Sequence, residues 1–182
     1  LPMGPQTERE LVKRLIKLAL LTVACLSAAQ VWAGDWPQFR YDIGRTAASP
    51  SELPVNLQLQ WTRTLPAPRP AFPKELRLAY DASYEPVVLG KSMFLPSMVS
   101  DSVTALDTET GEQRWRFFAG GPVRFAPVAC KGRVYFVSDD GYLYCVDADD
   151  GSLRWKFRGL PEGMPDRKVI GHGRLISLWP AR

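Results

Sequence analysis

The stretch that decides the fold is ALDTETGEQRW, residues 105–115, because it returns forty residues later as CVDADDGSLRW, residues 145–155. Asp, Gly, Arg and Trp keep their places in both copies. Upstream, at an offset of 41, PVV at 86–88 matches PVA at 127–129, and MFL at 93–95 matches VYF at 134–136. A fixed period of this length indicates a repeat architecture in which each unit is one small structural element.

Each repeat divides into four short strands. Val, Tyr, Phe and Leu favour strands, and the Gly-containing turns between them supply the positive φ that tight hairpins need. The expected strands are 84–89, 92–98, 103–107 and 113–118 in the first unit, and 125–130, 133–138, 142–147 and 153–158 in the second. A third unit is expected to start near Lys168, where GRLI at 173–176 echoes GRVY at 132–135.

Four antiparallel strands in such a unit make the blade of a β-propeller. A single blade cannot bury both faces of its sheet, so blades need neighbours. The predicted fold class is therefore all-β, a propeller of four-stranded blades of which about two and a part are present after an N-terminal signal peptide. Because propeller rings use at least about four blades, we expect the sequence to be the N-terminal fragment of a longer protein.

Composition and charge narrow the classes of function. The chain has 182 residues, of which 46% are hydrophobic and 23% charged, so it can build a core. Its 16 Pro and 14 Gly suit strands and turns better than a helical bundle. The net charge of +4 divides into +2 for residues 1–33 and +2 for the remaining 149 residues, where 19 basic side chains stand against 17 acidic ones. Such a balance predicts no basic patch for nucleic acid.

Residues 1–33 have the pattern of an export signal. Basic residues at 13, 14 and 17 precede an apolar run at 18–26, and small residues follow as far as Ala33. The run is too short for a comfortable permanent membrane span. We expect cleavage between Ala33 and Gly34 and export to the periplasm or cell envelope. Two alternatives stay open: an uncleaved N-terminal anchor, and lipidation of Cys25, where TVAC partly matches a lipoprotein box.

The unit A-x-D-x-x-T-G-x-x-x-W resembles the repeat of the pyrroloquinoline-quinone-like (PQQ-like) propellers. Its positions are Ala105, Asp107, Thr110, Gly111 and Trp115 in the first copy, and Cys145, Asp147, Gly151 and Trp155 in the second. The second copy departs from the pattern with Cys145 in place of Ala and Asp150 in place of Thr. DWPQFR at 35–40 resembles the leader of exported bacterial members, so the resemblance covers about residues 35–182.

The resemblance implies one of two functions. The group contains quinoprotein dehydrogenases, which typically bind their quinone near the propeller axis against a Trp and adjacent cysteines, with calcium nearby. It also contains non-catalytic, BamB-like scaffolds of outer-membrane assembly. No Cys-Cys pair occurs in this sequence. We therefore favour a scaffold that binds other envelope proteins, with no catalytic, cofactor-binding or metal residue. The alternative is a PQQ- and calcium-dependent dehydrogenase whose cofactor site lies mostly in a missing C-terminal part.

The motif residues also have an interpretation that needs no ligand. Asp107 can accept hydrogen bonds from turn amides, and Gly111 can adopt the left-handed conformation. In the PQQ-like family the Trp docks between blades, so Trp115 and Trp155 are expected to be interblade contacts. Cys130 and Cys145 fall on the first and third strands of one unit. Such strands lie about 9–10 Å apart, which predicts free thiols.

The remaining segments are assigned by composition. LQLQW at 57–61 has the look of an isolated outer strand, which in a closed ring can complete the last blade. PAPRPAFP at 66–73 is expected to be an extended spacer, with a Pro-rich partner site as the alternative. The expected division is 1–33 signal peptide, 34–56 leader, 57–83 closing strand and linker, 84–119 blade, 124–159 blade, and 166–182 start of a further blade.

Overall fold

Ten strands and one short 3-10 helix make up the regular structure of the described residues. The computed structural model describes residues 34–78, 80–160, 163, 165, 167–171 and 174–177. The predicted signal peptide, with Cys25 and Ala33, lies outside the described residues. No helix in the described ranges has the length and apolar character needed to cross a membrane.

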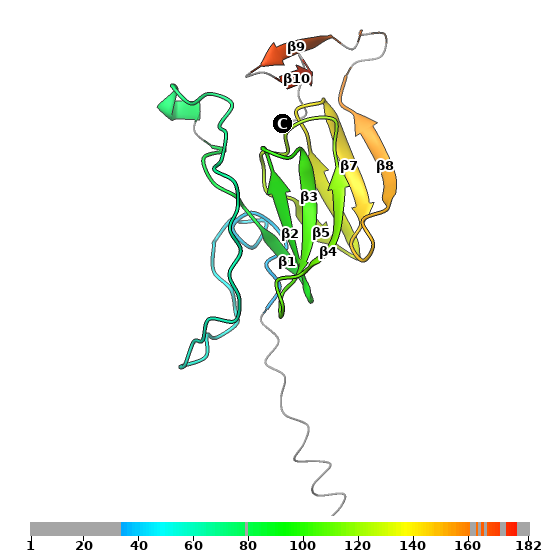
Figure 1. Cartoon of the computed structure of the whole chain (residues 1–182). Coiled ribbons are helices and arrows are strands. Elements are labelled where there is room, and N and C mark those ends of the chain that lie inside the picture. The colour runs from blue at the N-terminus through cyan, green and yellow to red at the C-terminus, as the bar shows by residue number, and fades with distance from the viewer. Residues whose placement is uncertain are drawn as a thin grey trace, which may run out of the picture. The chain divides into compact units, whose positions relative to one another are not determined.

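The strands form two four-stranded antiparallel sheets and one hairpin (Figure 1). The first sheet consists of β1 (Val87–Leu89), β2 (Ser92–Ser97), β3 (Ser102–Asp107) and β4 (Gln113–Phe118), in that order. The second consists of β5 (Val128–Cys130), β6 (Arg133–Val137), β7 (Tyr142–Asp147) and β8 (Leu153–Arg158). The hairpin of β9 (Lys168–Gly171) and β10 (Arg174–Ser177) follows, and the 3-10 helix η1 spans Leu76–Leu78.

Both predicted four-strand units are therefore present, with shorter first strands than the sequence suggested. The first strands were expected at 84–89 and 125–130, whereas β1 and β5 begin at Val87 and Val128. Each strand follows a proline, Pro86 or Pro127, which has no N–H to extend the ladder. The same residue thus shortens the same strand in both repeats.

A β-bulge occurs at the same place in each sheet. In the first sheet Ala105 pairs with Trp115 but Leu106 pairs with Gln113, so Arg114 has no opposite residue. In the second sheet the shift between Cys145 and Val146 leaves Arg154 in the same position. A bulge redirects the side chain of its extra residue. In both sheets the bulge directs the extra arginine toward the turn that precedes its own strand.

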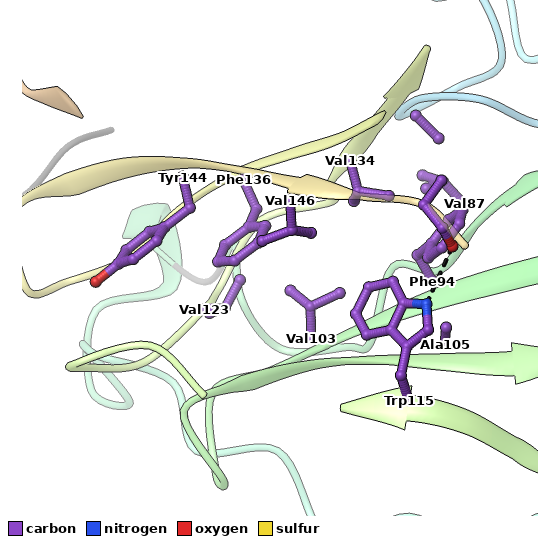
Figure 2. Close-up of a cluster of buried hydrophobic side chains, with 12 residues drawn as sticks. Val87, Phe94, Val103, Ala105, Trp115, Val123, Val134, Phe136, Tyr144 and Val146 are labelled. Atoms are coloured by element: carbon purple, nitrogen blue, oxygen red, sulfur yellow. Dashed lines mark hydrogen bonds between the residues drawn. The ribbon is translucent and has the colours of Figure 1, made fainter. Parts of the chain in front are cut away.

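The apolar core lies between the two sheets (Figure 2). Val87, Phe94, Val103 and Trp115 contribute from the first sheet, and Val134, Phe136, Tyr144 and Val146 from the second. Phe136 and Tyr144 stack with ring centroids 5.2 Å apart. The edge of Phe117 meets both rings at 5.8 and 5.5 Å. This packing buries one face of each sheet against its neighbour.

The segment at 57–61 has no regular structure, and its predicted role as a closing strand depends on a last blade that the described residues do not include. We expected an isolated strand there, but the structure forms none. No described strand lies beside it to pair with its N–H and C=O groups, and Leu57 and Leu59 remain 72% and 85% exposed. Trp61 at its end is nevertheless fixed by a contact with the first sheet, which is described below.

Candidate functional site

The turn between β3 and β4 is organised by Asp107. Its Oδ1 accepts hydrogen bonds from the amides of Glu109 and Thr110 at 2.8 and 3.0 Å. Its Oδ2 accepts from the bulged Arg114 at 2.6 Å. The Arg114 hydrogen bond, followed by the two amides, lowers the pKa of Asp107 to about 2. The carboxylate is thus committed to the turn and to its own strand.

The turn between β7 and β8 repeats this arrangement. Asp147 Oδ1 accepts from the Asp149 amide at 2.9 Å, and its Oδ2 accepts from Arg154 at 2.6 Å. The Arg154 hydrogen bond is the main reason that the pKa of Asp147 is lowered. The Arg154 side chain is more exposed than that of Arg114. The second pair therefore has more water competing for its charges.

The departure from the repeat at Asp150 preserves a hydrogen bond. In the first turn Thr110 Oγ1 accepts from the Glu112 amide at 3.2 Å. In the second turn Asp150 Oδ1 accepts from the Ser152 amide at 2.8 Å. The carboxylate of Asp150 therefore replaces the Thr110 hydroxyl as the hydrogen-bond acceptor, and the turn keeps its shape.

An indole ring packs against each of these two turns. We call the place that it occupies the indole socket, which consists of the Gly of the turn and the carbonyl group of the residue after the Asp. Trp115 Nε1 donates to the Ala148 carbonyl at 3.0 Å, the dashed line in Figure 2. A Cβ added to Gly151 would stand 2.6 Å from the Trp115 ring, and φ at this glycine is +73°. Gly is required here both for the backbone conformation and for the close approach of the ring.

The first blade holds a second indole in the same way. Trp61 Nε1 donates to the Thr108 carbonyl at 3.0 Å, and a Cβ on Gly111 would stand 2.6 Å from the Trp61 ring. Arg63 adds a hydrogen bond to the Gly111 carbonyl at 3.1 Å. The strand-then-Trp pattern at 57–61 is visible in the sequence, but this contact was not predicted from it. The matching signal was the Asp-to-Gly turn of the first repeat, forty-six residues beyond Trp61 at Asp107.

The other predicted motif residues lie as follows. Ala105 and Cys145 are both fully buried at equivalent points of β3 and β7. Trp115 is 8% exposed, whereas Trp155 is 40% exposed and meets no indole socket among the described residues. The interblade position expected for Trp155 is therefore not seen in the described part of the chain, since its ring contacts Tyr135 of its own blade instead.

The cysteines and acidic residues bear on the quinone alternative. Cys130 on β5 and Cys145 on β7 are free, with β6 between them, as predicted. Within the residues that the structure describes, no three His, Cys, Asp or Glu side chains are grouped to hold a metal ion. The described residues therefore show neither such a group of metal ligands nor the adjacent cysteines that the resemblance implies for a quinone site.

A buried ion network was not anticipated from the sequence. Arg124, in the connection between β4 and β5, donates to Asp139 at 2.6 Å and to Asp81 at 2.7 Å. It also donates to the Arg69 carbonyl at 2.8 Å, and the Ala71 amide donates to Asp81 at 2.8 Å. Buried charges need such partners. The network ties the Pro-rich segment, expected to be a plain spacer, to the second blade.

Asp140, the neighbour of this network, fixes the same face of the second blade. It accepts hydrogen bonds from the Tyr144 hydroxyl, from the Gly120 amide at 2.9 Å and from the Tyr142 amide at 3.1 Å. Burial, followed by the hydrogen bond to Asp140, raises the pKa of the Tyr144 hydroxyl. Tyr144 therefore stays protonated and acts as a donor in the core.

Among the exposed apolar side chains, two groups lie close together in the sequence. Leu53, Val55, Leu57 and Leu59 occupy alternate positions of a segment without regular structure that bends at 55–56, and we call this segment the apolar ribbon. On β8, Leu153, Trp155 and Phe157 are exposed on one face of the strand.

Repeated four-stranded blades joined by an indole socket define a β-propeller of PQQ-like repeats, the predicted fold class. The family model described as outer membrane protein assembly factor BamB matches residues 24–176, so the chain belongs to that family. The search of curated proteins gave no match.

Solved structures of two kinds are similar to the chain. The quinohemoprotein alcohol dehydrogenase from Comamonas testosteroni is 25% identical over 75% of this chain and 21% of its own, with a TM-score of 0.51. BamB from Moraxella catarrhalis is 17% identical over 51% of this chain and 34% of its own, with a TM-score of 0.36. The chain thus spans about a fifth and about a third of the lengths of these two proteins.

Proposed function

We propose that the protein is a non-catalytic scaffold of the bacterial cell envelope, a propeller that binds other proteins. The observation that carries this proposal is the match of residues 24–176 to the family of the outer membrane protein assembly factor BamB. The export signal expected at 1–33 takes the chain to the periplasm under this proposal. Its partners are other envelope proteins.

The use of the motif residues supports a structural role. Both oxygens of Asp107 and both oxygens of Asp147 are engaged by their own turns and arginines. The Trp61 and Trp115 ring nitrogens donate to backbone carbonyls of the next repeat. The repeat thus uses its polar groups to fix one blade against another, and a rigid platform is what a scaffold requires.

The apolar ribbon supports protein binding. After the bend at 55–56, Leu57 and Leu59 alternate with the polar Gln58 and Gln60, a period-2 pattern suited to strand pairing. A partner strand can add to such a segment through backbone hydrogen bonds. Completion of a last blade by the same segment stays the competing prediction for this surface.

Site-specific photocrosslinking tests the proposal. The full chain with its signal is expressed in a Gram-negative bacterium, with a photoreactive residue at Val55 or Leu57, and a control at the exposed Lys74. We expect an adduct with one envelope protein from the ribbon positions and none from Lys74. If the ribbon gives only intrachain products and no other exposed surface gives an adduct, the scaffold proposal fails.

A quinoprotein dehydrogenase is the second candidate function. The similarity to the Comamonas testosteroni enzyme over 75% of the chain favours it. Because the described residues show neither a group of metal ligands nor adjacent cysteines, this candidate places the cofactor site elsewhere in the protein. We expect no alcohol-dependent reduction of a redox dye after PQQ and calcium are added to the exported protein. Reduction above a no-PQQ control would replace the scaffold by the dehydrogenase.

A further inference from the structure

The first strand of each blade lies at the edge of its sheet. Within the two described sheets, β1 pairs with β2 alone and β5 pairs with β6 alone, so each of these strands has a second edge that no sheet strand covers. The two sheets also approach each other most closely at β1 and β5. An uncovered strand edge presents N–H and C=O groups that can pair with another extended segment.

The leader occupies both of these edges. Trp36 and Val88 of β1 exchange backbone hydrogen bonds of 2.9 and 2.8 Å. The carbonyl group of the next residue, Pro37, accepts a hydrogen bond from the Ala129 amide of β5 at 2.8 Å. Two consecutive residues of the leader thus bind the two blades at once. We call the place where they bind the edge site, which consists of Val88, the Ala129 amide and the Gly90 amide.

The sequence of the leader fits the edge site. Asp35 Oδ1 accepts a hydrogen bond from the Gly90 amide at 2.6 Å, in the turn between β1 and β2. Trp36 precedes a proline, which biases its backbone toward the extended conformation that edge pairing requires. Pro37 lacks an N–H, but the group that it uses at the site is its carbonyl, which proline retains. The pattern Asp-X-Pro therefore supplies these polar groups in a form that is extended before binding, which lowers the entropy cost of binding.

The loop that follows the bound segment is strained. Side chains other than glycine rarely adopt a positive φ, and each instance costs free energy. Four non-glycine residues of this loop have φ between 54° and 76°: Arg40, Tyr41, Arg45 and Ala47. Every residue from 43 to 60 is exposed, and the far end of this stretch is held separately, by Trp61 in its indole socket. The leader can therefore leave the edge site with relief of backbone strain and without moving either blade.

We propose that the edge site binds extended Asp-X-Pro segments, and that the leader is a ligand supplied by the chain itself, which a partner segment of the same pattern replaces. The Asp accepts from the Gly90 amide, the middle residue pairs with Val88, and the Pro carbonyl accepts from the Ala129 amide. Strand addition of this kind takes its affinity from main-chain hydrogen bonds. The proposal rests on the proposed scaffold function for the existence of a partner, whereas the binding site itself is tested with peptides alone.

Peptide exchange on the full chain tests the proposal. A protease site is inserted between the exposed Glu52 and Leu53, and the folded chain is cut there, so that the leader is held by noncovalent contacts alone. A fluorescent peptide of residues 34–52 is then added and its anisotropy is measured. We expect the peptide to replace the leader and to bind saturably. The uncut chain should bind it at least about tenfold more weakly, because the tethered leader competes at a high effective concentration.

Two results of this exchange overturn the proposal. A leader that stays bound to the cut chain without exchanging is a permanent part of the fold. A leader that leaves the cut chain without the labelled peptide taking its place shows that the two strand edges do not form a binding site.

Matched peptides assign the binding to the edge site. Asp35→Ala removes the acceptor of the Gly90 amide and is expected to weaken the peptide about tenfold, because the lost hydrogen bond is charge-assisted. N-methylation of Trp36 removes the N–H that donates to the Val88 carbonyl and should weaken the peptide about tenfold or more. The control peptide is N-methylated at Glu52, which is exposed and lies outside the edge site. Equal affinity of all three peptides places the contact elsewhere and overturns the proposal.

Foreign peptides test the class of ligand. One peptide keeps the sequence of residues 35–37 and has only serine and glycine elsewhere, and the matched control peptide has the order of these three residues reversed. The first is expected to compete with the labelled peptide at least about tenfold better than the control. Equal competition by both, or competition by neither, overturns the assignment of Asp-X-Pro segments. Because no partner protein takes part in these titrations, their failure leaves the scaffold proposal standing.

Discussion

The two complete blades have the same strand order, the same bulge and the same Asp-Arg pair, yet their outer strands differ in burial. Trp115 on β4 is 8% exposed and Trp155 on β8 is 40% exposed. Their ring partners Phe94 and Tyr135 stand at similar distances, 5.7 and 6.0 Å. The difference is the indole socket of the following blade. The outer strand of one blade thus carries the indole ring, and the turn of the next blade buries that ring.

The blades differ a second time at their entry. At the offset of 41, Arg124 and Asp139 of the second repeat correspond to Ser83 and Met98 of the first. Only the second of the two described blades therefore has the buried ion network that reaches Asp81. The repeat carries the general design of a blade, and this network distinguishes one blade from the other.

The largest expected effect is the loss of that network. Arg124→Met should lower the free energy of unfolding by about 3–5 kcal/mol, because it leaves Asp81 and Asp139 buried without a cation. Urea denaturation of the full chain measures it. The control is Arg116→Met, whose exposed side chain bonds Thr104 on the neighbouring strand. If the two variants lose equally little, the network contributes nothing that distinguishes the second blade.

Truncation of the two outer tryptophans sharpens the comparison directly. Trp115→Ala should cost about 3–4 kcal/mol, since a buried indole leaves a cavity. Trp155→Ala should cost about 1 kcal/mol, since much of its ring already faces solvent. The two denaturation midpoints give the answer. A cost for Trp155 as large as that for Trp115 would show that another part of the protein covers it.

Alanine at the turn glycines separates backbone strain from the socket contact. Gly151→Ala should cost about 2–3 kcal/mol, combining a positive φ with the clash against Trp115. Gly132 has a similar φ of +71° but nothing within 4 Å of an added Cβ, so Gly132→Ala should cost only about 1 kcal/mol. Gly111 and Gly90 form the same pair in the first blade. Equal losses of unfolding free energy within each pair would show that the contact with the indole ring adds nothing to the requirement for glycine.

The smallest expected effect is a loss of folding stability at acidic pH. The pKa of Asp107 is about 2 in the folded chain and about 3.9 when unfolded, so its contribution to stability is complete above about pH 4. That contribution is lost as pH falls from about 4 toward 2. Asp107→Asn should therefore flatten the stability curve in this window, with Asp147→Asn acting in the same direction. Parallel curves for wild type and both variants would count against the two Asp-Arg pairs.

The sequence predicted what is local and repeated. Strands and turns lie within a few residues of one another, so the pattern around Asp107 could be recognised twice, whereas the β-bulges at Arg114 and Arg154 were not predicted. The contacts that it missed join distant residues. Arg124 and Asp81 are 43 positions apart, and Trp61 and Thr108 are 47 apart. No periodicity connects Arg124 with Asp81, because a buried charge network is set by how segments pack in space, whereas the turn that receives Trp61 has the recognisable Asp-to-Gly pattern.

The segment at 57–61 shows the opposite case, in which a local strand pattern lies in a segment without regular structure. Its alternation is that of a strand, but strand structure requires a paired neighbour, and none is found among the described residues. Trp61 keeps its place through the indole socket rather than through a ladder.

We conclude that the Gly of each turn is required to receive the indole of the preceding segment. A double-mutant cycle of Trp115→Ala and Gly151→Ala tests it most directly, with the free energy of unfolding as the readout. Gly151→Ala should cost about 2–3 kcal/mol in the wild type and only about 1 kcal/mol once the Trp115 ring is gone. The same cost of Gly151→Ala in both backgrounds would contradict the claim, because glycine would then serve the turn alone.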